Sequence, residues 1–264
     1  MREAAHKLIA SLRANHTPVL SVVIPAYNEE KRLGPTLAGC MEFLDREGIP
    51  HEIVVVDDGS RDQTASLVNT FSQRHPHIRL ISLERNRGKG AAVRTGVFAA
   101  QGALILLNDA DGATPIAELF RLLAEMALTG CEVVIGSRAL DSPDTHVEKK
   151  LYRFLLGRIF ALLVNLLVVP HIKDTQCGFK LFTRSAAQQI FSYQTLDGFS
   201  FDVEVLYLAH KLGYRVREVA VNWHDVAGSK LNLLIDPLHM GWDLLGIRFR
   251  HRSLPPPLPS PKSK

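Results

Sequence analysis

Short apolar runs bounded by turn-forming residues recur through the first half of the chain. Short, mainly apolar runs of this kind are typical of buried strands. They lie at residues 19–24, 53–56, 78–83, 103–107 and 132–135. Stretches with helical periodicity separate them, at residues 32–47, 63–74, 90–100 and 116–129. This alternation predicts an α/β fold with a doubly wound, mainly parallel sheet and helices on both faces.

The pattern changes after residue 138. A polar loop at 141–150 leads into an apolar helix from 151 to 169, and a further strand is expected at 216–222. We expect four parts: an N-terminal helical extension (1–17), the main α/β domain (18–225), a C-terminal amphipathic membrane-docking segment (226–252) and a disordered Pro-rich tail (253–264). The uncharged stretch at 159–172 is shorter than the roughly 18–20 residues needed to cross a bilayer.

Composition excludes several classes of protein. With 264 residues, 46% of them hydrophobic and 22% charged, the chain has the composition of a folded globular protein. Its net charge of +4 suits anionic partners, but the basic residues are dispersed and no nucleic-acid-binding motif is present, so we expect no nucleic-acid partner. Three scattered cysteines indicate neither a disulfide framework nor a zinc site, and favour a reducing compartment.

Carboxylates follow the expected strands. Asp109 and Asp111 leave the fourth strand one residue apart, so both could bind one hard cation, Mg²⁺ or Mn²⁺, on a diphosphate. Alternatively, this is a turn in which Asp111 caps a helix that begins near Thr114-Pro115. Asp57 and Asp58 follow the second strand, where one could cap the Asp-Gly turn and the other accept an N–H from a nucleobase; a cap without a ligand is the alternative.

A glycine-rich loop, Asn86-Arg87-Gly88-Lys89-Gly90, precedes an Ala-rich helix. Its backbone N–H groups and Lys89 could meet phosphate at the helix N-terminus. The loop matches neither the Walker pattern nor GxGxxG, which argues against a dinucleotide-binding oxidoreductase.

Eight segments together resemble the inverting GT-A glycosyltransferases of family 2, the family of the polyprenyl-phosphate sugar synthases. They occur in this order: VVIPAYNEEKRL, EIVVVDDGSRDQT, NRGKGAAVRTG, NDADGATP, VVIGSR, IKDTQCGFKLF, FSFDVEVLYLA and VNWHDVAGSKL. Within the family, DTQCGFKLF, FDVE and GSKL are most similar to the dolichyl-phosphate β-glucosyltransferases. The resemblance implies transfer of glucose from UDP-glucose to a polyprenyl phosphate by an enzyme peripheral to the cytoplasmic face of a membrane.

The resemblance also implies roles for individual residues. The nucleotide-sugar site would comprise Pro25, Ala26, Tyr27, Glu29, Asp57, Lys89, Asp109, Ala110, Asp111 and Lys230. Asp109 and Asp111 would hold the metal, Arg138 and Lys180 the acceptor phosphate, and Asp109, Asp111, Arg138 and Asp202 would be catalytic. Some relatives have Arg in place of His224, which leaves the role of that position open.

The acceptor decides whether a general base is needed. A sugar hydroxyl would require one, and Asp202 is the candidate, whereas a phosphate is already anionic near neutral pH. Non-catalytic alternatives are a helix cap for Asp202 and an ion pair with Asp141 for Arg138. Two other functions stay open: a transferase of the same fold that uses GDP-mannose or a non-lipid acceptor, and a catalytically inactive scaffold. The sequence does not indicate an oligomeric state.

Overall fold

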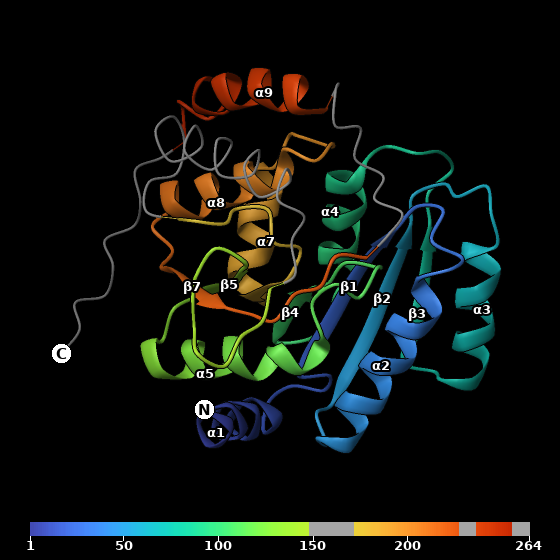
Figure 1. Cartoon of the computed structure of the whole chain (residues 1–264). Coiled ribbons are helices and arrows are strands. Elements are labelled where there is room, and N and C mark those ends of the chain that lie inside the picture. The colour runs from blue at the N-terminus through green and yellow to red at the C-terminus, as the bar shows by residue number, and fades with distance from the viewer. Residues whose placement is uncertain (148–171, 227–235, 255–264) are drawn as a thin grey trace.

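A seven-stranded sheet forms the centre of the molecule (Figure 1). The computed structural model describes residues 1–147, 172–226 and 236–254. Within them the strand order is β3-β2-β1-β4-β6-β5-β7. The strands are β1 (Leu20–Ala26), β2 (His51–Asp57), β3 (Ile78–Ser82), β4 (Leu104–Leu107), β5 (Val133–Ser137), β6 (Lys180–Thr183) and β7 (Val216–Ala220). β6 runs antiparallel to both β4 and β5, and the other pairings are parallel.

Helices cover both faces of the sheet, as predicted. They are α1 (Arg2–Arg13), α2 (Leu33–Arg46), α3 (Thr64–Arg74), α4 (Lys89–Ala99), η1 (Ile116–Glu118), α5 (Leu119–Thr129), α7 (Arg184–Tyr193), α8 (Phe201–Lys211) and α9 (Asp236–Arg250). One apolar core lies between the sheet and α1, α2, α3 and α5, and a second lies between the sheet and α4, α7 and α8. The sheet is therefore covered on both faces, while α1 packs on α5 and α9 packs on α8.

The sequence predictions match most of this architecture. The five apolar runs of the first half are strands β1 to β5, and the predicted strand near 216–222 is β7. Strand β6 was missed, and the helix expected at 116–129 begins as a separate 3₁₀ turn, η1. The expected helix at 151–169, Lys230 and residues 255–264 of the expected tail lie outside the described residues.

Helix α9 packs above α8 (Figure 1). Leu244 and Ile247 are buried in the second core, whereas Trp242 and Phe249 are exposed. Among the residues that the structure describes, no helix is both long enough and apolar enough to span a bilayer.

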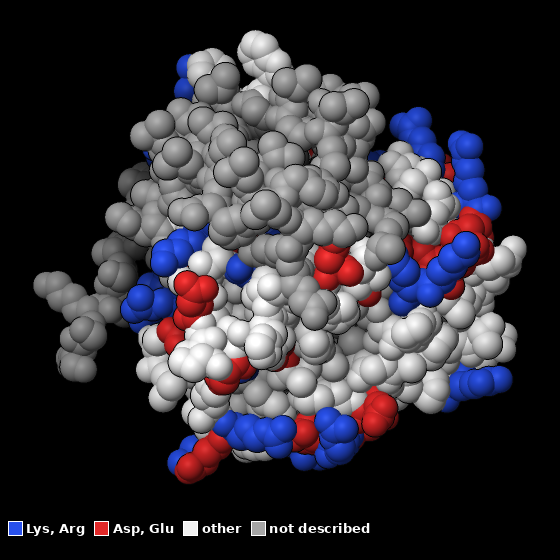
Figure 2. Space-filling view, viewed as in Figure 1, with Lys and Arg blue, Asp and Glu red and all other residues white. Residues whose placement is uncertain are grey.

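Charged side chains of both signs are interspersed on the face shown in Figure 2. Such mixing indicates that the surface described on this face does not produce a strong field of one sign. Oppositely charged groups are also paired at the carboxyl edge of the sheet, where Lys180 and Asp202 are buried and Lys89 and Asp109 are partly exposed.

Candidate active site

Two loops at the carboxyl edge of the sheet hold one another in place. The backbone N–H of Asn28 donates to Oγ of Ser60 (2.8 Å), and Oδ1 of Asn28 accepts from the N–H of Arg61 (2.8 Å). Asn28 has a φ of 52°, a left-handed conformation that asparagine tolerates better than most residues. In the register of β1 and β2, Ala26 lies opposite Asp57. The loops after β1 and β2 therefore form one unit.

The residues predicted to line the nucleobase pocket belong to this unit. Pro25 and Ala26 are the last residues of β1 rather than part of the loop, and Tyr27 and Glu29 follow them. Glu29 is buried, and its backbone N–H donates to Oγ1 of Thr64 (2.7 Å). The four residues thus reach the carboxyl edge together, beside the end of β2.

Asp57 and Asp58 both accept hydrogen bonds from backbone N–H groups. Oδ1 of Asp57 accepts from Ser60 (3.1 Å), while the two oxygens of Asp58 accept from Arg87 and Gly88 (2.8 Å each). Burial raises the pKa of Asp58, and the charge of Asp57 adds to the rise. Asp58 therefore anchors the glycine-rich loop. Within the described residues Oδ2 of Asp57 has no hydrogen-bond partner, and its contact with a nucleobase stays a prediction.

The glycine-rich loop packs tightly against the segment before α8. Gly88 has a φ of 105°, and a Cβ there would lie 2.4 Å from the carbonyl oxygen of Asp197. The same oxygen accepts from the N–H groups of Gly90 (2.7 Å) and Ala91 (3.3 Å). These amides were expected to bind phosphate, but they already have protein acceptors. The loop contributes the side chain of Lys89 to the site instead.

Lys89 and Asp109 form the central ion pair, with Nζ of Lys89 2.7 Å from Oδ1 of Asp109. Burial alone would lower the pKa of Lys89, but the carboxylates of Asp109 and Asp202 raise it above its usual value. Conversely, burial alone would raise the pKa of Asp109, and the charges of Lys89 and Lys180 lower it. Both groups are therefore charged at neutral pH. Gly178 packs so closely that a Cβ there would lie 2.0 Å from Oδ2 of Asp109.

Asp111 lies on the same loop and caps its turn. Oδ1 of Asp111 accepts from the N–H of Ala113 (3.0 Å) within the turn. It does not cap the following helix, which begins at Ile116 after Pro115 and, among the described residues, has no side-chain cap. Oδ2 lies 3.9 Å from Nη1 of Arg32, whose Nε donates to Glu29 (2.7 Å). Burial and the negative charge of Asp109 raise the pKa of Asp111. The two aspartates thus repel one another, and a cation between them would relieve that repulsion.

The donor chemistry of Asp109 and Asp111 fits a divalent cation. Their side chains are 35% and 27% exposed, so solvent and ligands reach both. They offer carboxylate oxygens, the donors that Mg²⁺ and Mn²⁺ prefer.

Arg138 follows β5 and pairs with Asp174 instead of Asp141. Its Nε and Nη2 lie 2.7 Å and 2.8 Å from the two carboxylate oxygens, and its backbone N–H also donates to Asp174 (2.9 Å). Burial alone would raise the pKa of Asp174, but Arg138 lowers it well below the usual range. The guanidinium also lies 5.5 Å from the centre of the Trp223 ring. Arg138 is therefore held in one orientation from two sides.

Lys180 and Asp202 form a second, deeper ion pair. Lys180 is the first residue of β6 and is fully buried. Its Nζ lies 2.5 Å from Oδ1 of Asp202 and 2.6 Å from the carbonyl oxygen of Cys177. Asp202 lies in the first turn of α8 and is also buried. In this structure Lys180 therefore meets protein groups, and its charge reaches the site through its effect on Asp109.

The loop that carries Asp111 is also held by hydrogen bonds to two of its backbone carbonyl oxygens. The carbonyl oxygen of Ala110 accepts from Oγ1 of Thr36 (2.9 Å), and that of Ala113 accepts from the N–H of His224 (3.0 Å). The segment after β7 therefore returns to the edge of the sheet where Asp111 lies. Lys230 follows on this segment but is outside the described residues.

The structure brings the predicted metal ligands Asp109 and Asp111 close enough to Lys89 for their charges to interact. The charges of Arg138 and Lys180 also act on Asp109. Sequence reasoning missed the partners: Arg32 and Gly178 were not identified, Asp174 was not linked to Arg138, and Lys180 was not linked to Asp202. A signal for the last pair was present, since a lysine inside the apolar string Phe-Lys-Leu-Phe needs a buried carboxylate.

Comparison with known proteins shows which family this chain belongs to. The model for glycosyl transferase family 2 matches residues 21–191. The dolichyl-phosphate beta-glucosyltransferase of Dictyostelium discoideum is 40% identical over 95% of this chain and 81% of its own length. The proteins of that name from Homo sapiens and Saccharomyces cerevisiae are 40% and 38% identical, over 92% and 88% of this chain and 79% and 75% of theirs.

Solved structures share the fold at lower identity. Glucosyl-3-phosphoglycerate synthase from Mycobacterium tuberculosis superimposes with a TM-score of 0.65 at 20% identity, over 93% of this chain and 84% of its own. The same enzyme with Mn²⁺ and UDP-glucose gives a TM-score of 0.64 at 19% identity, over 93% and 82%. The GT-A-like fold is therefore established, and with the family match it identifies this chain as a glycosyltransferase, a member of glycosyl transferase family 2.

Proposed function

We propose that this enzyme transfers glucose from UDP-glucose to a dolichyl-type polyprenyl phosphate, with inversion at the anomeric carbon. The observation that carries the proposal is the pairing of Lys89 with Asp109 beside Asp111, at the edge where the loops after β1 and β2 meet. Relatives that match most of this chain are named dolichyl-phosphate beta-glucosyltransferases.

The donor end of the reaction needs a stabilised leaving group. Breaking the bond between the anomeric carbon and UDP leaves an electron pair and negative charge on the diphosphate. A divalent cation bound by Asp109 and Asp111 would stabilise that charge as a Lewis acid, and a solved neighbour of this fold contains Mn²⁺ with UDP-glucose. Lys89 would also stabilise the negative charge on the diphosphate, because its pKa is raised and it stays protonated.

The acceptor end needs positioning more than proton transfer. A phosphate oxygen forms the new bond to the anomeric carbon from the side opposite to UDP, which converts an α-linked donor into a β-linked product. Because this phosphate is anionic near neutral pH, no general base is required. Arg138 is oriented toward this role by Asp174 and Trp223. Lys180 would act on the acceptor through its positive charge, and Asp202 would hold Lys180 in position.

The lipid acceptor lies in a membrane, and we assign docking to the C-terminal segment. On α9, Trp242 is 76% exposed and Phe249 is 67% exposed, whereas Leu244 and Ile247 pack inward. Arg248, Arg250 and Arg252 are exposed nearby. Exposed aromatic residues beside cations suit the headgroup region of an anionic membrane. Three free, buried cysteines are consistent with the reducing side of that membrane.

A panel of substrates tests the proposal. Purified protein is incubated with dolichyl phosphate and either UDP-glucose or GDP-mannose, with Mg²⁺, Mn²⁺ or a chelator, and lipid-linked sugar is extracted and quantified. We expect product from UDP-glucose that depends on the divalent cation. Product from GDP-mannose alone would support another donor, and transfer to a soluble sugar alone would support another acceptor. Metal-independent UDP binding without turnover would indicate a scaffold.

A further inference from the structure

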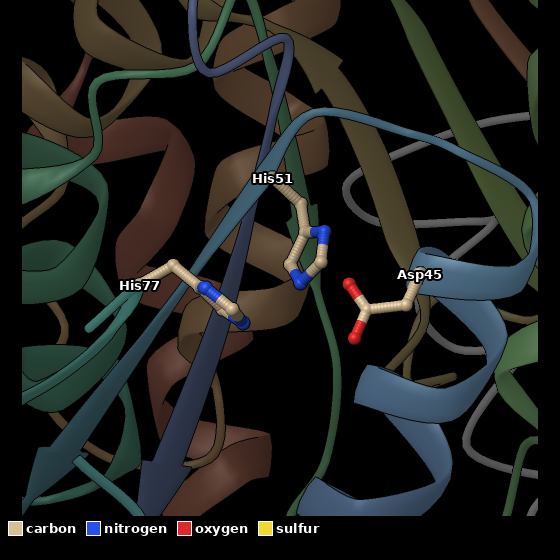
Figure 3. A group of neighbouring side chains, drawn as sticks. All are labelled: Asp45, His51 and His77. Carbon is tan, nitrogen blue, oxygen red and sulfur yellow. The ribbon is translucent and has the colours of Figure 1, made fainter. Parts of the chain in front are cut away.

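A group of metal-ligating side chains lies at the amino edge of the sheet, opposite the active site. His51 is the first residue of β2, His77 immediately precedes β3, and Asp45 is in the last turn of α2. Figure 3 shows His51 between His77 and the carboxylate of Asp45. Each residue offers one ligand atom, and these atoms all lie within 4.8 Å of one another. The length of β2 separates this cluster from Asp57 by about 20 Å.

Two buried nitrogen atoms in the cluster have no hydrogen-bond partner. Within the described part of the chain, Nε2 of His51 and Nε2 of His77 are both buried and unpaired. Buried polar side-chain atoms are nearly always satisfied, and an unmet one costs about 1–3 kcal/mol. The rings are close, with centroids 4.7 Å apart and planes inclined by 72°. Two unmet nitrogens at one place indicate a shared missing partner.

The hydrogen bond made by His51 determines what that partner must be. Nδ1 of His51 lies 2.8 Å from the carbonyl oxygen of Ile49. A carbonyl only accepts, so Nδ1 carries the proton and Nε2 of the neutral ring presents a lone pair. Histidines that ligate metals are commonly oriented by this kind of contact with a backbone carbonyl.

We propose that Asp45, His51 and His77 bind a Zn²⁺ ion, separate from the cation of the active site. Two imidazoles and one carboxylate suit Zn²⁺ and not Mg²⁺, which prefers oxygen donors. Tetrahedral bonds of about 2.0 Å place ligand atoms roughly 3.3 Å apart, so the cluster must contract. The exposed side chain of Asp45 is able to move inward. A bound ion would join the end of α2 to the starts of β2 and β3.

Zinc titration of the full chain tests this site. Excess Mg²⁺ is present to occupy Asp109 and Asp111, and binding is followed by calorimetry and by the melting temperature. We expect one tight site per chain. At free Zn²⁺ about 100 times the dissociation constant, the melting temperature should rise by about 5 °C or more. His51→Ala and His77→Ala should abolish the site, and Asp45→Asn should weaken it at least tenfold.

His75→Ala is the matched control, because its ring centroid lies 6.1 Å from that of His77 but its side chain is not part of the cluster. It should bind Zn²⁺ as the wild type does. Equal tight binding by His51→Ala and His77→Ala would overturn the proposal, as would absence of a tight site in the wild type. NMR of the wild-type histidine nitrogens avoids dependence on the folding of variants. Zn²⁺ must shift the two Nε2 resonances, and unchanged resonances would refute the site.

Discussion

Gly178 offers a direct test of how the Asp109 carboxylate is placed. A Cβ at this position would lie 2.0 Å from Oδ2, 2.2 Å from Cγ and 2.5 Å from Oδ1 of Asp109. Real Cβ contacts are essentially never shorter than 3.0 Å, so in Gly178→Ala the carboxylate must move by about 1 Å. Asp109 would then leave both its 2.7 Å contact with Lys89 and its position beside Asp111.

The expected effect is large for activity and moderate for stability. Misplacing a group by about 1 Å costs roughly 100-fold in rate, equivalent to about 2.7 kcal/mol of transition-state stabilisation. Gly178 is half-buried and the atoms it would meet are the end of the Asp109 side chain, so the cost in unfolding free energy should be near the low end of the about 1–3 kcal/mol typical of overpacking. We therefore expect Gly178→Ala to fold, with kcat/KM reduced about 100-fold and a higher concentration of divalent cation needed for half-maximal activity.

Steady-state transfer of glucose to dolichyl phosphate, together with urea unfolding, separates the two effects. The control is Gly39→Ala, because Gly39 is exposed on α2 and a Cβ there would meet nothing within 4 Å. It should keep full activity and gain up to about 1 kcal/mol of stability from helix propensity. A Gly178→Ala protein with kcat/KM within threefold of the wild type would refute the reasoning.

Three further changes probe the remaining parts of the molecule. Asp109→Ala and Asp111→Ala should abolish turnover and leave the circular dichroism spectrum unchanged; activity within a few-fold of wild type would remove the metal assignment. Asp174 has a lowered pKa in the folded state, so its carboxylate stabilises the fold above about pH 4 and this contribution is lost as the pH falls through the folded pKa. In urea unfolding, Asp174→Asn should lower the free energy of unfolding by about 3–5 kcal/mol at pH 7, and the deficit should shrink at acidic pH; a deficit independent of pH would contradict this. Replacing Trp242 and Phe249 with Ser should reduce flotation with anionic liposomes at least tenfold at low salt, and equal flotation would exclude α9 as the docking surface.

The fold was largely predictable because its signals are local. Strands buried on both faces are mainly apolar, and β1, β2 and β4 all contain consecutive apolar residues. β6 was not predicted because it begins with Lys180, a charge that a local pattern places on the surface. Only the partner Asp202, 22 residues further along the chain, makes that charge tolerable in the core. Pairings over such separations are not visible in periodicity.

Some residues of the candidate site were likewise predictable from local sequence, and others were not. Asp109 and Asp111 were identified because ligands of α/β sheets gather at the carboxyl ends of strands. The roles of Asp58 and Asp174 depend on contacts with residues 29 and 36 positions away, so they required the structure. The glycine-rich loop was predicted to bind phosphate. The N–H groups of Gly88 and Gly90, however, already donate to Asp58 and to the carbonyl oxygen of Asp197. Local motifs identified the charged groups, and tertiary contacts determined which of them are already paired.

The most direct test of the central claim follows labelled glucose from UDP-glucose into lipid. The purified protein is mixed with dolichyl phosphate and Mn²⁺, and the organic phase is counted and the anomeric configuration of the product determined. The Lys89–Asp109–Asp111 arrangement predicts a β-linked glucosyl phospholipid that disappears with a chelator and in Asp111→Asn. An α-linked product, or equal transfer by Asp111→Asn in the presence of the chelator, would contradict it.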